Sequence, residues 1–493
     1  MVNKRKSQRP NVIVIMSDDH GHWALGSAGN TEIHTPNLDS LSKAGIRFEN
    51  FFCASPVCSP ARASFLTGRI PSQHGVHDWI RSGNVAKHEL NPEIKNEPIF
   101  ADENERIEYL HGIQAYTDIL SKSGYQCGLS GKWHLGDSLN PQKGFSHWFT
   151  IARGGCNYYE SDIVIDGDIK IETEYITDVI TKDALSFIDK QAKTEDPFYL
   201  SVHYTAPHSP WEYGQHPKEM IDLYKDCPFE SVPEEPNHPW QIDSAPRGEG
   251  EKRKELLQGY YAAITAMDRG IGEILNKLKE INLLEDTLIF FTSDNGMNMG
   301  HHGIWGKGNG TFPQNMFDTS VKVPTIVSRP GHIPAGVVNM DLLSHYDFMP
   351  TLLDYLGLKD EYAAERPGKS FAPLLRGESL NNPDDVVIYD EYGAVRMIRT
   401  QKWKYIHRYP YGPHELYHLV EDPEERHNLV NMESTLVIRE SLKSKLDDWF
   451  VLYANPHKDG VRECVTGYGQ LGLAGTFAKG RNNYKQRRNR NDY

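Results

Sequence analysis

Short apolar runs alternate with longer segments of helical periodicity along most of this chain. Five runs are rich in β-branched or aromatic residues and are predicted as strands: Val12–Met16, Gln126–Leu129, Phe198–Tyr204, Leu288–Thr292 and Val323–Ser328. Four segments between them have the period of a helix: Tyr116–Ser123, Ile176–Ala192, Glu255–Ile281 and His345–Leu356. Strands that alternate with helices indicate a mostly parallel sheet with helices on both faces. The pattern therefore predicts a large α/β unit.

After Gly377 the pattern changes. Three short runs with tight connections predict an antiparallel meander, and an amphipathic helix follows; the ranges are Val386–Tyr392, Val395–Thr400, Trp403–Tyr409 and Ser434–Tyr453. We therefore expect two units, 1–377 and a smaller α+β subdomain at 378–493. The tail from Gly467 is rich in glycine and then basic (Arg481, Lys485, Arg487, Arg488, Arg490), and we expect it to be solvated. The Pro- and His-rich stretch Thr205–Arg253 is predicted as a long loop beside an active site.

Composition narrows the class of protein. The net charge of −14 argues against nucleic acid as a partner, because phosphate backbones require a basic surface. The apolar runs are too short to cross a membrane. No apolar signal segment follows the basic start, so the sequence as given predicts a cytoplasmic protein, or a periplasmic or secreted one whose signal peptide has been removed. The six scattered cysteines form no Cys-x-x-Cys pair and indicate reduced thiols.

Two acidic pairs directly follow predicted strands. Asp18-Asp19 comes after Val12–Met16, and Asp294-Asn295 comes after Leu288–Thr292. Ligands of open α/β sheets bind outside the carboxyl ends of the strands. Three carboxylates and one amide oxygen suit calcium or magnesium better than zinc. Asp and Asn also favour turns at strand ends, so either pair alone would signify little, but the coincidence of both favours a metal site.

The segment Cys58-Ser59-Pro60-Ala61-Arg62, continued by Thr67-Gly68-Arg69, forms a recognisable motif. It resembles the Cys-x-Pro-x-Arg signature of the type I, formylglycine-dependent sulfatases of the alkaline-phosphatase-like superfamily. Further elements resemble that family in the same order: Asp18-Asp19, Gly131-Lys132-Trp133-His134-Leu135-Gly136, Ala206-Pro207-His208-Ser209-Pro210, Ser293-Asp294-Asn295-Gly296, Gly306-Lys307 and Pro350-Thr351-Leu352-Leu353. The resemblance covers about residues 11–430, and ordered agreement of several elements is far more specific than one motif.

The resemblance implies the family's fold and chemistry. A separate maturation enzyme would oxidise Cys58 to Cα-formylglycine, whose hydrate is the nucleophile. Calcium would be held by Asp18, Asp19, Asp294, Asn295 and the modified Cys58. Arg62 would stabilise the hydrate, and Lys132 and Lys307 would contact sulfate oxygens and offset charge repulsion. His208 would protonate the departing oxygen, and His134 would take a proton from the second hydroxyl to expel sulfate.

Other candidates carry a weaker signal. Substrate contacts are predicted for Trp79, Arg81, Arg153, Asn157 and His302, for which surface or packing roles are equally consistent. His20, His22, His301 and His302 lie near the acidic pairs and suggest zinc, but their spacing matches no standard zinc set.

We therefore expect a hydrolase that removes sulfate from a sulfated saccharide, with the maturation enzyme as a transient partner and no nucleic acid or membrane partner. A phosphonate or phosphate monoester hydrolase of the same superfamily and an aryl sulfatase are the alternative enzymes. A non-catalytic carbohydrate-binding relative is disfavoured, because Cys58, Arg62 and all the metal ligands are present. The sugar, the sulfated position and the oligomeric state stay open.

Overall fold

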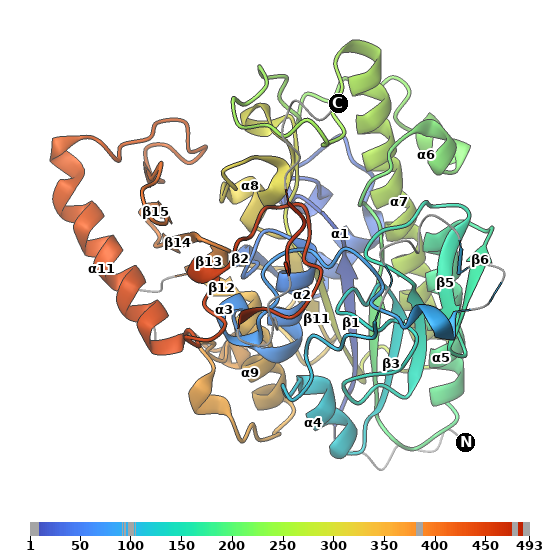
Figure 1. Cartoon of the computed structure of the whole chain (residues 1–493). Helices are drawn as coiled ribbons and strands as arrows, with labels where there is room; N and C mark the ends of the chain where they lie inside the picture. The colour runs from blue at the N-terminus through green and yellow to red at the C-terminus, as the bar shows by residue number, and fades with distance from the viewer. Residues whose placement is uncertain are drawn as a thin grey trace.

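The computed structural model describes residues 9–90, 92, 95, 96, 103, 105–380, 388–475 and 482–486. Within these residues, ten strands form one sheet in the order β12-β2-β11-β8-β1-β7-β3-β4-β5-β6 (Figure 1). Their bounds are β1 Asn11–Ser17, β2 Ile46–Phe52, β3 Gln126–Gly131, β4 His147–Ile151, β5 Ser161–Ile165, β6 Asp168–Glu172, β7 Phe198–His203, β8 Thr287–Ser293, β11 Thr325–Ser328 and β12 Val337–Ser344. The five predicted strands are confirmed as β1, β3, β7, β8 and β11.

The centre of the sheet is parallel. β1 pairs in parallel with β7 and β8, and β3 pairs in parallel with β4 and β7. Antiparallel pairing occurs where β11 lies between β2 and β8 and where β5 lies between β4 and β6. The predicted mostly parallel sheet is thus confirmed, with antiparallel strands added toward its edges.

Helices cover both faces of the sheet, and β1 is buried along its whole length. Its side chains at Val12, Val14 and Met16 pack toward α2 (Cys58–Thr67), α4 (Tyr116–Lys122) and α9 (His345–Tyr355). The alternate side chains, Ile13 and Ile15, pack toward α1 (Pro36–Lys43), α5 (Ile176–Gln191) and α7 (Gly250–Glu280). Such burial on both faces explains why β1 reads as a continuous apolar run.

The predicted loop from Thr205 to Arg253 is partly wrong. A short helix, α6 (Lys218–Asp222), interrupts it, and α7 begins at Gly250, five residues before the predicted Glu255. Among the described residues, no helix combines the length and the apolar composition needed to span a bilayer.

The C-terminal part carries a separate four-stranded antiparallel sheet, in the order β13-β14-β15-β16. The strands are β13 Ile388–Tyr392, β14 Val395–Arg399, β15 Trp403–Arg408 and β16 Glu415–His418, and α11 (Leu436–Tyr453) packs on them through Leu442, Leu446 and Phe450. The meander and its closing helix are confirmed, while β16 was not predicted. A boundary at residue 377 stays a prediction.

The C-terminal tail is not simply solvated. Gln470 is completely buried and Tyr484 is 3% exposed. Gly469 has a φ of +111°, and a Cβ there would lie 3.2 Å from the Trp79 ring, so glycine permits this close approach. Figure 1 shows the dark red segment crossing the blue region of α2 and α3 (Pro71–His74). The expectation was wrong for the described part of the tail; Lys485 is half-buried there, and the tail arginines lie outside the described residues.

Candidate active site

The two acidic pairs meet at the carboxyl ends of neighbouring strands. Ser17 of β1 pairs with Ser293 of β8, so the residues that follow emerge side by side. Asp294 Oδ1 accepts hydrogen bonds from the backbone N–H groups of Asp19 (3.1 Å) and Asn295 (2.8 Å). Asp19 adopts a left-handed φ of 64°, a conformation that aspartate tolerates better than most residues.

Cys58 lies against this acidic cluster. It is the first residue of α2, it is 2% exposed, and its Sγ lies 3.3 Å from Asp18 Oδ1. Single ligand atoms of Asp18, Asp19, Cys58 and Asp294 lie within 4.8 Å of one another. Asn295 Oδ1 is buried and has no hydrogen-bond partner among the described residues. A buried acceptor of this kind calls for a partner, and a cation held by oxygen ligands fits it.

Three cationic side chains surround the same cluster. Arg62 donates from Nε to Asp294 Oδ2 (2.9 Å) and from Nη1 to the Lys132 carbonyl (3.2 Å). The Lys132 ammonium is paired with Asp18, and the Lys307 ammonium is paired with Asp19. Lys307 Nζ also lies 2.7 Å from Cys58 Sγ. These cations converge on the sulfur together with the carboxylates, so an anionic group bound there would meet donors.

The charges keep the acidic side chains ionised although they are buried. Burial raises the pKa of Asp18, but Lys132 and His208 outweigh burial and lower that pKa to about 2. The site therefore holds carboxylates at neutral pH, as a divalent cation requires.

His134 has one committed and one free ring nitrogen. Its Nε2 lies 2.7 Å from the carbonyl oxygen of Ile80, which accepts only if Nε2 carries the proton. Nδ1 is buried and has no partner among the described residues. Burial, and then Lys132, hold the pKa of His134 well below 6.5. The ring is thus neutral, with an unprotonated Nδ1 that can accept a proton.

His208 differs in exposure. Its side chain is 26% exposed, and its Nε2 lies 3.7 Å from Asp19 Oδ2. Nδ1 lies 2.7 Å from the carbonyl oxygen of Ser209, which fixes the ring. A histidine at the edge of a buried cluster can exchange its proton with solvent and donate it to a departing group.

Comparison with known proteins identifies the family. The profile described as Sulfatase matches residues 10–358, and the profile for the N-sulphoglucosamine sulphohydrolase C-terminal region matches residues 300–451. The chain belongs to the sulfatase family. It is thus a sulfuric ester hydrolase, with an acidic and cysteine-containing cluster where the family has its metal and formylglycine.

Curated relatives of this sulfatase cover most of its length. N-acetylglucosamine-6-O-sulfatase of Bacteroides thetaiotaomicron is 27% identical over 503 residues, covering 86% of this chain and 83% of the relative. Ulvan-active sulfatase of Formosa agariphila is 28% identical over 462 residues, covering 89% and 80%. Choline-sulfatase of Rhizobium meliloti is 28% identical over 462 residues, covering 85% and 82%.

Solved structures confirm the fold. A protein solved in complex with its substrate D-glucosamine-2-N,6-O-disulfate superposes with a TM-score of 0.73 at 24% identity, covering 90% of this chain and 98% of that one. Phosphonate monoester hydrolase of Agrobacterium radiobacter gives a TM-score of 0.69 at 22% identity, covering 90% and 96%. At these identities the likeness concerns architecture alone.

The predicted substrate contacts of the sulfatase lie in different surroundings. Trp79 and Arg81 flank Ile80, the residue that contacts His134, and the Arg81 guanidinium lies 5.7 Å from the Trp79 ring centre. Arg153 is held by Asp162 in a bidentate pair (2.8 and 3.1 Å). Asn157 is exposed, and His302 stacks on Phe317 at 3.9 Å. Geometry brings Trp79 and Arg81 next to the site and commits Arg153 and His302 to protein partners; all these roles stay predictions.

The histidines that suggested zinc make hydrogen bonds and packing contacts inside the protein. His20 Nε2 lies 2.7 Å from the Ala24 carbonyl oxygen, and His301 packs against Trp23 at 4.6 Å. Burial is the first cause that lowers the pKa of His22, to about 3, which keeps its ring uncharged. Among the described residues, the groups with metal-ligand geometry include only His208 from the histidines.

Sequence reasoning missed residues that support the cluster from behind. Tyr260 of α7 donates to the Asp19 carbonyl oxygen (2.9 Å), and His203 Nδ1 lies 3.1 Å from the Lys132 carbonyl oxygen. His345 Nε2 lies 3.0 Å from the Ser293 carbonyl oxygen. His203 lies one residue before the end of the predicted strand Phe198–Tyr204, a position that could have marked it, whereas the middle of a long helix gives no signal for Tyr260.

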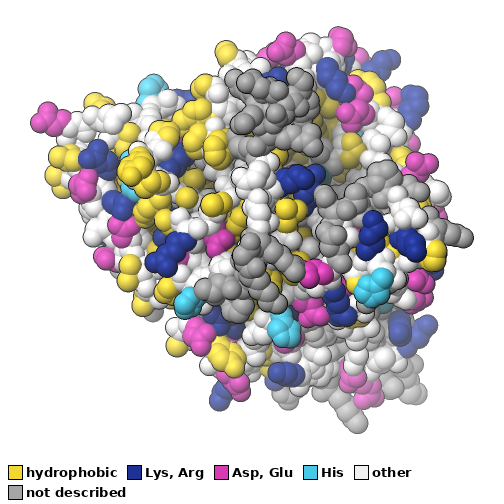
Figure 2. Space-filling model, in the orientation of Figure 1, with side chains coloured by type: hydrophobic (Ala, Val, Ile, Leu, Met, Phe, Trp, Pro, Cys, Tyr) yellow, Lys and Arg dark blue, Asp and Glu magenta, His cyan; other side chains and the backbone are white. Residues whose placement is uncertain are grey.

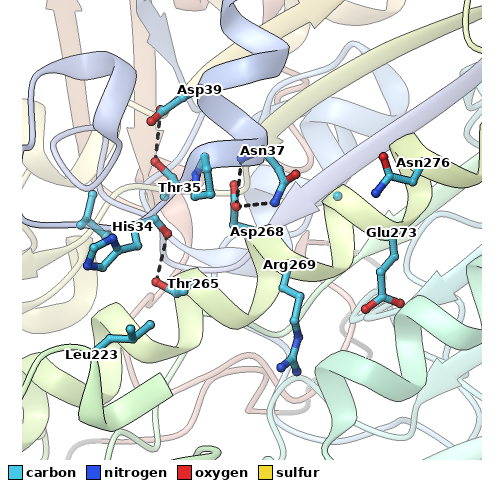
Figure 3. Close-up of a pocket in the computed structure, with 13 residues that line it drawn as sticks. His34, Thr35, Asn37, Asp39, Leu223, Thr265, Asp268, Arg269, Glu273 and Asn276 are labelled. Atoms are coloured by element: carbon cyan, nitrogen blue, oxygen red, sulfur yellow. Dashed lines mark hydrogen bonds between the residues drawn. The ribbon is translucent and has the colours of Figure 1, made fainter. Parts of the chain in front are cut away.

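Away from the active site, a hollow lies between the start of α1 and α7, and none of the site residues lines it (Figure 3). Its volume is about 610 Å³. Asp268 accepts hydrogen bonds from the N–H groups of Asn37 (3.1 Å) and Leu38 (2.8 Å), and from the Asn37 amide (2.9 Å). Its carboxylate therefore serves the N-terminus of α1, where unpaired N–H groups require acceptors.

Proposed function

We propose that this sulfatase hydrolyses a sulfate ester on a saccharide, with calcium and a formylglycine formed from Cys58 by a maturation enzyme. The observation that carries the proposal is the buried position of Cys58, whose Sγ lies 2.7 Å from Lys307 Nζ and 3.3 Å from Asp18 Oδ1. The names of two relatives, N-acetylglucosamine-6-O-sulfatase and ulvan-active sulfatase, support a saccharide as substrate.

Asp18, Asp19, Asp294, Asn295 and the modified residue 58 would hold the calcium ion. The bound ion would polarise the sulfuryl oxygens, and the aldehyde hydrate would supply the attacking oxygen. Lys132 and Lys307 would bind sulfate oxygens. Arg62, which bonds to Asp294, would stabilise the hydrate of residue 58. These preorganised charges would stabilise the negative charge that develops during transfer.

Two histidines would divide the proton transfers. His208, partly exposed at the edge of the cluster, would donate a proton to the departing sugar oxygen. His134, buried with an unprotonated Nδ1, would take a proton from a hydroxyl of residue 58. One ring would donate a proton and the other would accept one, as a reaction that needs one acid and one base requires.

Choline sulfate and phosphonate monoesters are the competing substrates, because the relatives include a choline-sulfatase and the solved structures include a phosphonate monoester hydrolase. A panel can separate them: N-acetylglucosamine 6-sulfate, sulfated ulvan oligosaccharides, choline sulfate, 4-nitrophenyl sulfate and the phosphonate monoester 4-nitrophenyl phenylphosphonate. Protein co-expressed with a maturation enzyme is assayed for released sulfate by ion chromatography and for released phenol.

We expect sulfate release from a saccharide, loss of this activity in Cys58→Ala, and retention in Cys464→Ala, which removes an exposed cysteine. Turnover of the phosphonate monoester or of choline sulfate that exceeds turnover of every saccharide would contradict the proposal.

A further inference from the structure

The segment His77–Arg81 connects the active site with the C-terminal tail. It follows α3, and its residue Ile80 is 1% exposed. On one side it contacts residues of the active site, and on the other it contacts Gly467–Gln470. The segment His77–Arg81, called the connector below, therefore links the active site to a part of the chain that is remote in sequence.

On the active-site side, both backbone groups of Ile80 are used. Its N–H donates to Ser59 Oγ (2.9 Å), and Ser59 directly follows Cys58. Its carbonyl oxygen lies 2.7 Å from His134 Nε2. The position of this carbonyl thus decides which nitrogen of His134 carries the proton.

On the other side, Gln470 binds the connector with its backbone and its side chain. Its N–H donates to the Trp79 carbonyl (2.7 Å), and its carbonyl accepts from the Arg81 N–H (3.1 Å), so it brackets Ile80. Its side-chain Oε1 accepts from the N–H groups of His77 (2.8 Å) and Asp78 (3.3 Å). Its Nε2 donates to the carbonyl oxygens of Gly75 (3.0 Å) and Gly472 (2.9 Å).

Asp78 adds a second tie to the same tail. Its Oδ2 accepts from the N–H groups of Gly467 (3.0 Å) and Gly469 (3.2 Å), and its Oδ1 accepts from the Tyr392 hydroxyl (2.5 Å). Trp79 Nε1 donates to the Gly467 carbonyl (3.0 Å). The connector is therefore fixed by side chains and backbone from both parts of the molecule.

We infer that Gln470 is a positioning residue for the reaction: it holds the Ile80 carbonyl so that His134 keeps its proton on Nε2 and offers Nδ1 as the base. The inference rests on the proposed role of His134. A glutamine suits the task because one side chain supplies both an acceptor for two N–H groups and a donor for two carbonyls. Removing hydrogen-bond partners that orient metal-ligating histidines typically changes metal affinity or activity about 10- to 100-fold, and we expect the same scale for a catalytic histidine.

The test is the ring tautomer of His134, read from ¹⁵N–¹H correlation spectra of histidine-labelled full-length protein. His134→Asn assigns the signal by its disappearance. Gln470→Met preserves side-chain bulk and removes the four side-chain hydrogen bonds. Gln486→Met is the matched control, because Gln486 is exposed and bonds only within its own stretch, to Asn482 and Tyr484, among the described contacts.

We expect the wild-type protein and Gln486→Met to show the Nε2–H tautomer, and Gln470→Met to show a mixture of tautomers. On the substrate that wild type turns over best, kcat for Gln470→Met should fall about tenfold with KM within about twofold. If Gln470→Met does not fold, Asp78→Asn loosens the same connector and should shift the tautomer in the same direction.

An unchanged Nε2–H signal in the folded variant, or an Nδ1–H signal in wild type, would overturn the inference. The spectrum requires no substrate, so it stands apart from the proposed function. Absence of sulfate release by wild type would instead reject that proposal.

Discussion

At the residue scale, the site is a balance of buried charges. Asp18, Asp19 and Asp294 face Arg62, Lys132 and Lys307, and every one of these side chains is at most 9% exposed. Removing one partner of a buried pair leaves a charge uncompensated, which costs about 3–5 kcal/mol. We therefore expect that replacing any one of these six residues alone lowers the stability of the protein.

The two histidines are predicted to respond differently to the leaving group. Replacing His208 by Gln removes the proposed acid, so turnover of a sulfate ester of a sugar alcohol should fall about 10²- to 10⁴-fold. Turnover of 4-nitrophenyl sulfate should fall much less, because its phenolate leaves without a proton. His134→Gln should slow both substrates alike, since its step follows departure. Steady-state kcat for the four combinations of variant and substrate checks this, because kcat, unlike kcat/KM, includes the step that follows departure. Equal sensitivity of the two variants to the leaving group would contradict the roles.

The residues of the cluster could be predicted from sequence to different extents. Asp18-Asp19 and Asp294-Asn295 follow apolar runs that pair in parallel, so local patterns were sufficient to place them together. No local sequence pattern marks Gln470, because its contacts form only when the C-terminal segment folds back onto the residues after α3. Polar residues in a glycine-rich stretch are typical of solvated tails, and tertiary contacts override that composition here.

At the element scale, the connector His77–Arg81 carries a titratable group. Burial, the first cause, raises the pKa of Asp78 from 3.8 to about 6, against four hydrogen bonds that lower it. Because the folded-state pKa is the higher one, the associated stability is complete below about pH 4 and is lost as pH rises through about 6. The loss amounts to at most about 3 kcal/mol.

Asp78→Asn is predicted to remove this pH dependence. Urea unfolding of wild type and variant is compared at several pH values from 4 to 7.5. The difference in unfolding free energy, wild type minus variant, should fall as pH rises, most steeply between about pH 4 and 6, and level off above. A constant difference, or one that grows with pH, would contradict the assignment.

The two edge strands of the large sheet, β6 and β12, share a physical reason for not being predicted. Val337 and Val338 of β12 are 38% and 50% exposed, and β6 is exposed at Asp168 and Lys170. Apolar periodicity predicts buried elements, and edge strands with solvent-facing residues lack that pattern. The central strands, which position the site, are those that the pattern found.

At the scale of the whole molecule, buried charges also join the two sheets. Lys404 of β15 is completely buried and bonds to Asp318 (2.8 Å) and Glu425 (2.6 Å). Asp318 begins α8 (Asp318–Val321) of the large unit, and Arg399 of β14 also binds it (3.0 Å). On the face that Figure 2 shows, acidic and basic side chains are interspersed.

Lys404→Met is predicted to weaken this junction. Two buried carboxylates lose their shared ammonium, so the free energy of unfolding should fall by about 3–5 kcal/mol. Lys218→Met is the matched control, because its pair with Asp222 lies at the surface and should cost less than about 1 kcal/mol. Urea midpoints provide the comparison, and equal losses in the two variants would show that the junction contributes little.

The proposed chemistry depends most on residue 58, and mass spectrometry of the peptide that contains it tests that dependence directly. Protein made with a maturation enzyme should carry the aldehyde at this position, and sulfate release should rise in proportion to the converted fraction across preparations. A wholly unmodified Cys58 in protein that releases sulfate at full rate would contradict a formylglycine nucleophile at this position.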